Sequence, residues 1–199
     1  MLFSFLSPLA QEIAMVRKLE HGDTLVEVLM SVVVLSVVIV SAITLMARGM
    51  SEDLAAVQHT QVRLSIAGQT EMLRYLRDGY LQDPQSATGQ LWLSLFSGSP
   101  TYADTTQSNY STGSCTVTSG KNGFYLDASS GSAVITTFNP ALQPATIAVP
   151  GQGLWVEATR SNSIAPAYVD FQVRACWNGV GGLTQQQEVT VTRLYDPAH

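Results

Sequence analysis

Residues 28–47 read VLMSVVVLSVVIVSAITLMA and contain no charged residue, no proline and no glycine. At a rise of about 1.5 Å per residue, a helix of this length spans about 30 Å, the thickness of the hydrocarbon core of a bilayer. The many Val and Ile residues would suit a strand in water, but in lipid a single segment can pair all of its backbone amides only as a helix. The stretch therefore predicts a transmembrane helix.

Charged residues flank this apolar run unequally. Arg17 and Lys18 precede it, whereas Arg48 follows it together with the acidic residues Glu52 and Asp53. Basic residues on the N-terminal side favour retention of that end in the cytoplasm. We therefore expect a single-pass protein of the cytoplasmic membrane whose C-terminal part is exported.

A helical pattern continues beyond the apolar run. Ser51 and the two acids that follow it suit the start of a helical segment, and no proline occurs between the apolar run and Pro84. The apolar residues that approximate one helical face are Leu54, Val57, Leu64, Ala67, Met72, Tyr75 and Leu76. We expect one long helix from about Thr24 to about Tyr80, with its first half in lipid and its second half covering a domain.

After Asp83 the composition shifts to Ser, Thr, Gly, Asn and Pro, with short β-type runs between turn signals. Strands are predicted at residues 115–118, 124–127, 133–138, 154–160, 168–177 and 188–195, and a long surface loop at residues 97–113. Consecutive strands with short links favour an antiparallel sheet, and its apolar face needs cover. The sequence predicts an α+β fold in which the long helix packs on the antiparallel sheet of a head domain.

The junction before the apolar run reads KLEHG (residues 18–22) and then DTLVE (residues 23–27). It resembles the N-terminus shared by type IV prepilins, type II secretion pseudopilins and competence pseudopilins, over about residues 17–47. In that family a charged leader ends in Gly, and the apolar segment that follows has Glu at its fifth position. By this resemblance a prepilin peptidase cuts between Gly22 and Asp23, and Glu27 is the residue that serves filament assembly.

The resemblance also implies a division of the chain. It gives a leader peptide at residues 1–22, a long N-terminal helix at residues 23–82 with its transmembrane half at about residues 28–47, and an extracellular β-rich head at residues 83–199. Met15 is an alternative start that gives the shorter leader MVRKLEHG. The family usually carries Phe or Met at the first mature position and methylates that amine, whereas this chain has Asp23, which would carry the methyl group.

Glu27 has a physical reason to be functional. A carboxylate within an apolar helix costs about 2.5–3.5 kcal/mol near the bilayer centre and is usually retained for a partner. A cut after Gly22 creates a positively charged α-amine on Asp23, four residues away and available from a neighbouring copy. Pairing with that amine would set the axial register of one subunit on the next. The alternative is a solvated acid near the end of the helix.

The two cysteines, Cys115 and Cys176, lie far apart and form no CxxC pair, which argues against a metal knuckle or a thioredoxin-type site. In an exported, oxidising environment they can form a disulfide. Closing a loop of about 60 residues would contribute roughly 4 kcal/mol. Buried free thiols are the alternative.

The sequence carries no recognisable enzyme motif. Its three histidines fit neither a catalytic triad nor a zinc site, so we predict no enzyme, no catalytic residue, no metal and no cofactor. The strand acids Asp127, Glu157 and Asp170 are interpreted as solvated face residues. The three tryptophans at positions 92, 155 and 177 fit either core packing or a surface aromatic patch.

The favoured function is a structural subunit of the type IV pilin kind, with the bulky head favouring a minor pilin, assembled into an extracellular filament. The expected partners are a prepilin peptidase, other pilin subunits and, before assembly, membrane lipid. The net charge of −5 without a basic block disfavours nucleic acid. The alternatives are a pseudopilin of a type II secretion or competence DNA-uptake system, and a membrane-anchored adhesin or binding protein that does not polymerise.

Overall fold

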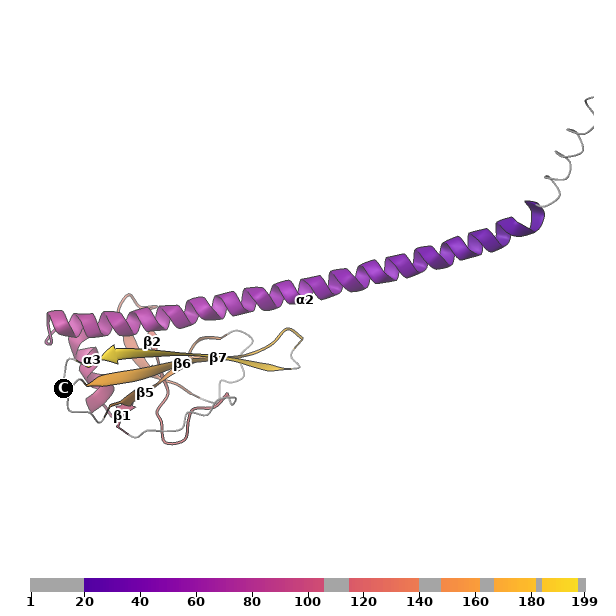
Figure 1. The fold of residues 1–199 in the computed structure, drawn as a ribbon. Helices are drawn as coiled ribbons and strands as arrows, with labels where there is room; N and C mark the ends of the chain where they lie inside the picture. The colour runs from indigo at the N-terminus through magenta and orange to yellow at the C-terminus, as the bar shows by residue number, and fades with distance from the viewer. Residues whose placement is uncertain (1–19, 106–114, 140–147, 162–166, 182–183, 197–199) are drawn as a thin grey trace, which may run out of the picture. The chain divides into compact units, whose positions relative to one another are not determined.

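The computed structural model describes residues 20–105, 115–139, 148–161, 167–181 and 184–196. The chain divides into two compact units, Met1–Glu52 and Asp53–His199. Within these residues, a long helix and a short one accompany the strands of one sheet, so the α+β class predicted from the sequence is confirmed. Figure 1 shows the order of these elements along the chain.

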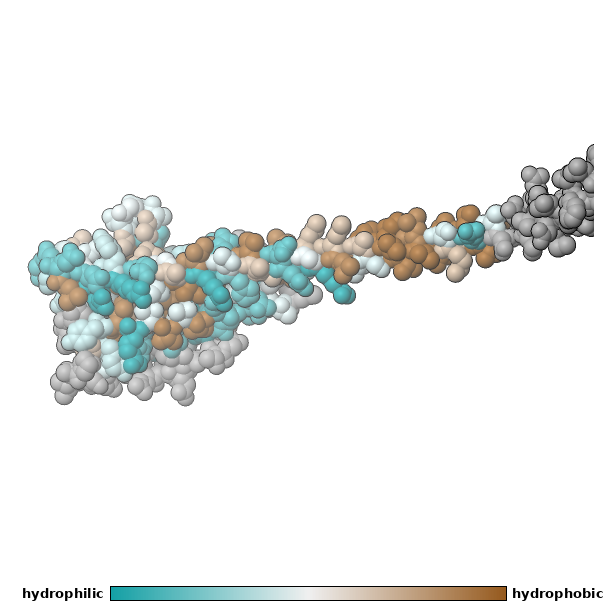
Figure 2. Space-filling model, turned by 45° about the horizontal axis from the view of Figure 1, so that its top comes forward, coloured by the Kyte–Doolittle hydropathy of each residue, from teal (hydrophilic) through white to brown (hydrophobic). Residues whose placement is uncertain are grey.

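Helix α2 comprises Glu20–Gln82 and contains the whole of the predicted apolar run. In the first unit every side chain described, from Thr24 to Glu52, is exposed. Figure 2 shows hydrophobic side chains gathered along this part of the helix. By length and composition this helix could cross a membrane once, and none of its most apolar window is buried against the rest of the chain.

In the second unit α2 packs on the sheet through a face that differs in most of its members from the one predicted. The buried residues are Val62, Ile66, Gln69, Thr70, Leu73 and Leu76, which follow the four-and-three spacing of a helical stripe. The predicted face was wrong in part. Leu54, Val57, Leu64 and Tyr75 are more than half exposed, whereas Leu76 is buried as predicted and Met72 packs against the core.

Gln69 explains the error. It is polar and therefore suggests a solvent-facing position, yet it is only 1% exposed. Its side-chain amide donates to the carbonyl oxygen of Leu126 at 2.8 Å and accepts from the backbone N–H of Leu126 at 2.9 Å. Because both polar atoms are paired with the backbone of a strand, the side chain can lie in the core at little cost.

In the described part of the chain the sheet has seven strands: β1 (Ala103–Asp104), β2 (Phe124–Asp127), β3 (Val134–Thr137), β4 (Val149–Pro150), β5 (Gly153–Arg160), β6 (Tyr168–Asn178) and β7 (Gln185–Tyr195). The main path runs β3-β2-β5-β6-β7 and is antiparallel throughout, while β1 and β4 add to β5 in parallel. The longest pairing, between β6 and β7, extends without interruption from Tyr168 opposite Tyr195 to Asn178 opposite Gln185.

Both faces of the central strands are covered. One face packs with α2 and with α3 (Ala87–Ser97) in the main core, which includes Trp92 and Phe171. The other face carries a second cluster, in which Trp155 and Cys176 pack with Phe138. Neighbouring residues of a strand point to opposite faces, so burial of consecutive residues along β5 shows that this sheet is sandwiched rather than half-solvated.

Three local features differ from the prediction. Helix α3 was not predicted; it begins after Ser86, whose hydroxyl oxygen accepts a hydrogen bond from the backbone N–H of Gly89 at 3.1 Å. Residues 115–118 were predicted as a strand but belong to no strand of the sheet. The predicted loop at 97–113 contains β1, and its residues 106–113 lie outside the described part of the chain.

A pair of leucines on α2 tests this packing. Leu73→Ala removes a side chain that is 0% exposed and should lower the free energy of unfolding by about 2–5 kcal/mol. Leu64→Ala removes the same atoms from a position that is 69% exposed and should change it by no more than about 0.5 kcal/mol. Urea unfolding followed by tryptophan fluorescence, in the detergent-solubilised protein, measures both. Equal losses would show that the buried face is assigned wrongly.

Candidate functional site

The segment that carries the prepilin-like motif lies in the first part of α2. Gly22 and Asp23 fall within the helix, which begins at Glu20, and residues 1–19 of the predicted leader, including Met15, lie outside the described residues. Glu27 is exposed and is the single charged residue between Thr24 and Ala47. It borders a shallow apolar hollow on the helix surface together with Met30, Ser31, Val34, Leu35 and Val38.

The spacing of this segment has a direct consequence for its charges. Asp23 and Glu27 are four residues apart in one helix, and residues at that spacing lie on the same face. A cut after Gly22 would therefore create an α-amine about one helical turn from Glu27 of the same chain. The helix presents this acid to the outside, and its neighbours in the hollow supply only apolar surface and one hydroxyl.

The hydroxyl groups of the apolar run are satisfied within the helix. Ser31, Ser36 and Ser41 each donate a hydrogen bond to the carbonyl oxygen four residues earlier, at 2.7–2.8 Å, and Thr44 does the same at 2.8 Å. These donors therefore need no partner from outside. Such bonds make the segment compatible with lipid or with a close-packed neighbour helix.

In the head domain, Cys115 and Cys176 form a disulfide, with their Cα atoms 5.7 Å apart. Cys176 lies on β6, while Cys115 begins a segment, residues 115–123, that crosses one face of the sheet. We call this segment the strap. The half-buried Cys115 and Val117 of the strap pack against the buried cluster of Phe138, Trp155 and Cys176. The disulfide therefore fastens one end of the strap to the sheet.

Beneath the strap lies a buried ion pair that the sequence analysis missed. Glu157 on β5 and Arg174 on β6 are 0% and 1% exposed, and the guanidinium Nη1 donates to Glu157 Oε1 at 3.0 Å. The same carboxylate oxygen accepts from the Trp155 indole N–H at 2.7 Å and from the backbone N–H of Thr118 at 3.1 Å. Arg174 also donates to the Thr118 hydroxyl at 3.0 Å. The pair thus binds the strap to two central strands.

The three strand acids consequently differ in their surroundings. Glu157 is wholly buried, so its interpretation as a solvated residue was wrong. Asp170 accepts two hydrogen bonds from Arg193, at 2.7 and 2.8 Å, and this pairing raises the pKa of the guanidinium above its ordinary value. Asp127 is the last residue of β2, where the backbone N–H of Ser129 in the following turn donates to it at 2.8 Å and lowers the pKa of its carboxyl group.

The tryptophans belong to the core. Trp92, Trp155 and Trp177 are each no more than 1% exposed, so the surface aromatic patch considered from the sequence is wrong and core packing is confirmed. Trp92 contacts Phe96 and Phe171, and Trp155 stacks on Phe138. No aromatic platform for a ligand is formed by these three residues.

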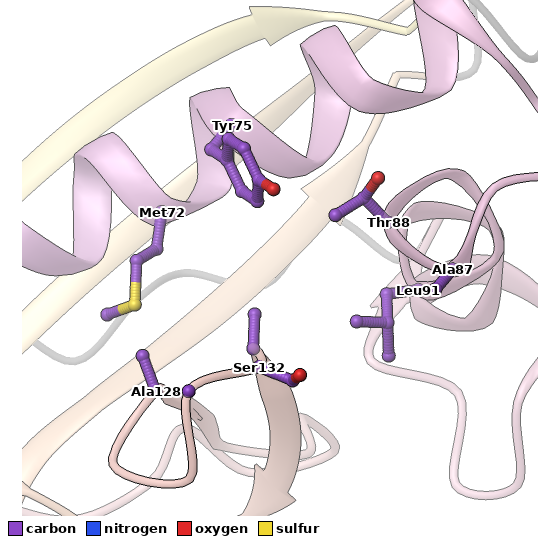
Figure 3. Close-up of a pocket in the computed structure, with 9 residues that line it drawn as sticks. Met72, Tyr75, Ala87, Thr88, Leu91, Ala128 and Ser132 are labelled. Carbon is purple, nitrogen blue, oxygen red and sulfur yellow. The ribbon is translucent and has the colours of Figure 1, made fainter.

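The head also has a hollow of about 570 Å³ beside α3 (Figure 3). It lies between α2, the first turns of α3 and the turn that joins β2 to β3, and its larger lining side chains are Met72, Tyr75, Thr88, Leu91 and Ser132. None of the residues that line it is charged. The hollow therefore suits an uncharged group and contains no acid–base pair.

Within the described residues, no group of three or more His, Cys, Asp or Glu side chains is arranged to hold a metal ion. Comparisons with protein-family models, with curated proteins and with solved structures find no match to this chain. A functional assignment therefore rests on the chain's own residues: the exposed apolar helix with Glu27, and a head fastened by a disulfide and a buried ion pair.

The buried pair gives a test of how the strap is held. Arg174→Met leaves the Glu157 carboxylate buried without its charged partner and should lower the free energy of unfolding by about 3–5 kcal/mol. Replacing both residues, in Glu157→Leu/Arg174→Met, removes the uncompensated charge and should restore most of that loss. Urea unfolding of the detergent-solubilised protein measures both variants. A double variant no more stable than Arg174→Met would contradict the pairing.

Proposed function

We propose that the chain is a pilin-like structural subunit, most similar in kind to a minor pilin. In this proposal a prepilin peptidase removes the leader after Gly22, the first half of α2 holds the subunit in the cytoplasmic membrane, and subunits then assemble into an extracellular filament. The observation that carries the proposal is the apolar helix itself. Residues 24–46 are exposed on every side and carry one charge, Glu27, next to the motif that resembles a prepilin junction.

The apolar surface of residues 24–46 suits first a lipid bilayer and then the interior of a filament. A helix that is hydrophobic all round is stable when lipid or other helices surround it. Exchange of lipid contacts for helix contacts changes the apolar environment little, because lipid tails and Leu or Val side chains are similarly apolar. The same segment can therefore serve first as a membrane anchor and then as the inner part of a polymer.

Glu27 can fix the axial position of one helix along another, which apolar contact alone does not do. Hydrophobic contact is non-directional, so helices held by Val, Leu and Ile alone could slide along one another. A carboxylate moved into apolar surroundings requires a partner, and the cut creates one in the α-amine of Asp23. Pairing between the Glu27 carboxylate of one subunit and the Asp23 amine of the next fixes the axial register between them.

The head is built to remain folded outside the cell. The Cys115–Cys176 disulfide needs an oxidising environment to persist. It secures the strap over the buried Glu157–Arg174 pair, so the outer face of the central strands is closed to water. These features support export of the second unit, as the flanking charges Arg17 and Lys18 also do.

Glu27→Gln tests the proposal, because it keeps the size of the side chain and removes its charge. Membrane insertion should be unchanged, while incorporation into filaments should fall about tenfold or more, the change that corresponds to about 1.4 kcal/mol. Glu52→Gln, an exposed acid on the same helix beyond the apolar run, is the matched control and should assemble normally. Immunoblots of membrane and sheared-filament fractions give both quantities.

Two outcomes would contradict parts of the proposal. Normal incorporation of Glu27→Gln would mean that the carboxylate does not set the register. A wild-type protein that is found only in the membrane, in cells that process and export it, would remove the filament from the proposal and favour a membrane-anchored adhesin.

A further inference from the structure

Strand β7 is the edge of the sheet, within the part of the chain that the structure describes. It pairs with β6 over Gln185–Tyr195 and has no strand on its other side. Proteins often use a proline or a β-bulge to prevent an edge strand from accepting another strand. Strand β7 contains no proline, and its pairing with β6 has no bulge. Between Glu188 and Arg193, the backbone N–H and C=O groups that point away from β6 can pair with another extended segment.

The charges on β7 do not protect this edge. Glu188 points toward α2, where its carboxylate accepts from Arg63 Nε at 2.9 Å and lies 3.8 Å from His59 Nδ1. Arg193 is turned onto β6, where it binds the Asp170 carboxylate through two hydrogen bonds and lies over the ring of Tyr168, 4.0 Å from its centroid. Both charges are thus neutralised by the strand's own domain rather than extended across the edge.

The uncharged middle of β7 is left exposed. Val189 and Val191 are 38% and 56% exposed and lie on the same face as Tyr195. The residues between Glu188 and Arg193 read VTVT, a combination of β-branched side chains that suits a strand with a neighbour on each side. This part of the edge is where a partner strand gains both hydrogen bonds and side-chain contact.

The opposite end of the main path supplies a matching strand. There β3 pairs only with β2 among the described strands, and Val134 on it is 46% exposed. Four antiparallel steps separate β3 from β7, so the two edge strands run in the same direction. In a filament all subunits point the same way, and a neighbour related by rotation and translation can bring its β3 beside β7 in parallel without being inverted.

We propose that the β7 edge of one head docks the β3 edge of the next copy of this chain, so that the sheet continues from subunit to subunit. This inference rests on the proposed function, because it takes the repeated neighbour from the filament. The contact is heterologous and does not close on itself, which is the type that a filament requires. It is separate from the contact through the apolar helix, and it adds main-chain hydrogen bonds between heads.

Paired cysteines test the docking directly. Val134 and Val191 lie on the same face of the sheet, by their registers with β2 and β6. In parallel neighbouring strands about 4.8 Å apart, cysteines on one face come within the Cα separation of about 4.4–6.8 Å that a disulfide needs. The double variants Val134→Cys/Val191→Cys and Val134→Cys/Val189→Cys cover two registers. The native cysteines are already joined to each other.

Mild oxidation of purified filaments, followed by non-reducing electrophoresis, gives the result. We expect one of the double variants to form a ladder of dimers, trimers and larger species that reduction collapses, while each single variant remains monomeric. Dimers in the Val191→Cys single variant would indicate two β7 strands related by a two-fold axis and would overturn the proposal. Normal filaments without a ladder would overturn the docking but not the filament, whereas absence of both filaments and ladder would overturn the two together.

Discussion

The exposed apolar surface of the first half of α2 is the constraint on which the rest of the structure depends. Residues 24–46 include a long series of Val, Leu, Ile and Met side chains that are exposed along the helix. Burial of apolar surface contributes about 25 cal/mol per Å², so leaving this segment in water would be very unfavourable. A helix that is hydrophobic all round is stable when lipid or other helices surround it.

The two halves of α2 differ in how their side chains are hydrogen-bonded and buried. In the first half the hydroxyls of Ser31, Ser36, Ser41 and Thr44 bond to the helix's own carbonyls, so the surface can be apolar on all sides. In the second half a narrow stripe from Val62 to Leu76 enters the core of the head, and Gln69 bonds to the backbone of β2. The helix therefore belongs both to the membrane-competent segment and to the folded head.

Much of this fold could be predicted from the sequence, because local patterns encode it. The long helix followed from its uninterrupted apolar and helical spacing, and the strands β2, β3, β5, β6 and β7 followed from alternation between turn signals. The buried face of α2 could not be predicted in the same way, since Gln69 is polar and its pairing with Leu126 is a long-range contact. The strap at residues 115–123 likewise owes its course to Cys176, Glu157 and Arg174, which come later in the chain.

The buried ion pair between Glu157 and Arg174 could have been predicted from the sequence. Glu157 lies within LWVEATR and Arg174 within FQVRACW, each a charged residue in the middle of an otherwise apolar strand. Opposite charges in such positions on successive strands favour a mutual pairing, because an unpaired charge is rarely buried. The motif at residues 18–27, in contrast, was interpreted from the sequence alone. The structure adds only that Glu27 is exposed on an apolar helix.

The N-terminus of the mature protein tests the central claim most directly. Mass spectrometry of the protein isolated from the membrane and filament fractions of its own cells should find a chain that begins at Asp23, with the apolar helix of residues 24–47 intact. A chain that still begins at Met1 or Met15, or that has been cut after the apolar run, would contradict the account, because the α-amine that Glu27 is proposed to bind would then not exist.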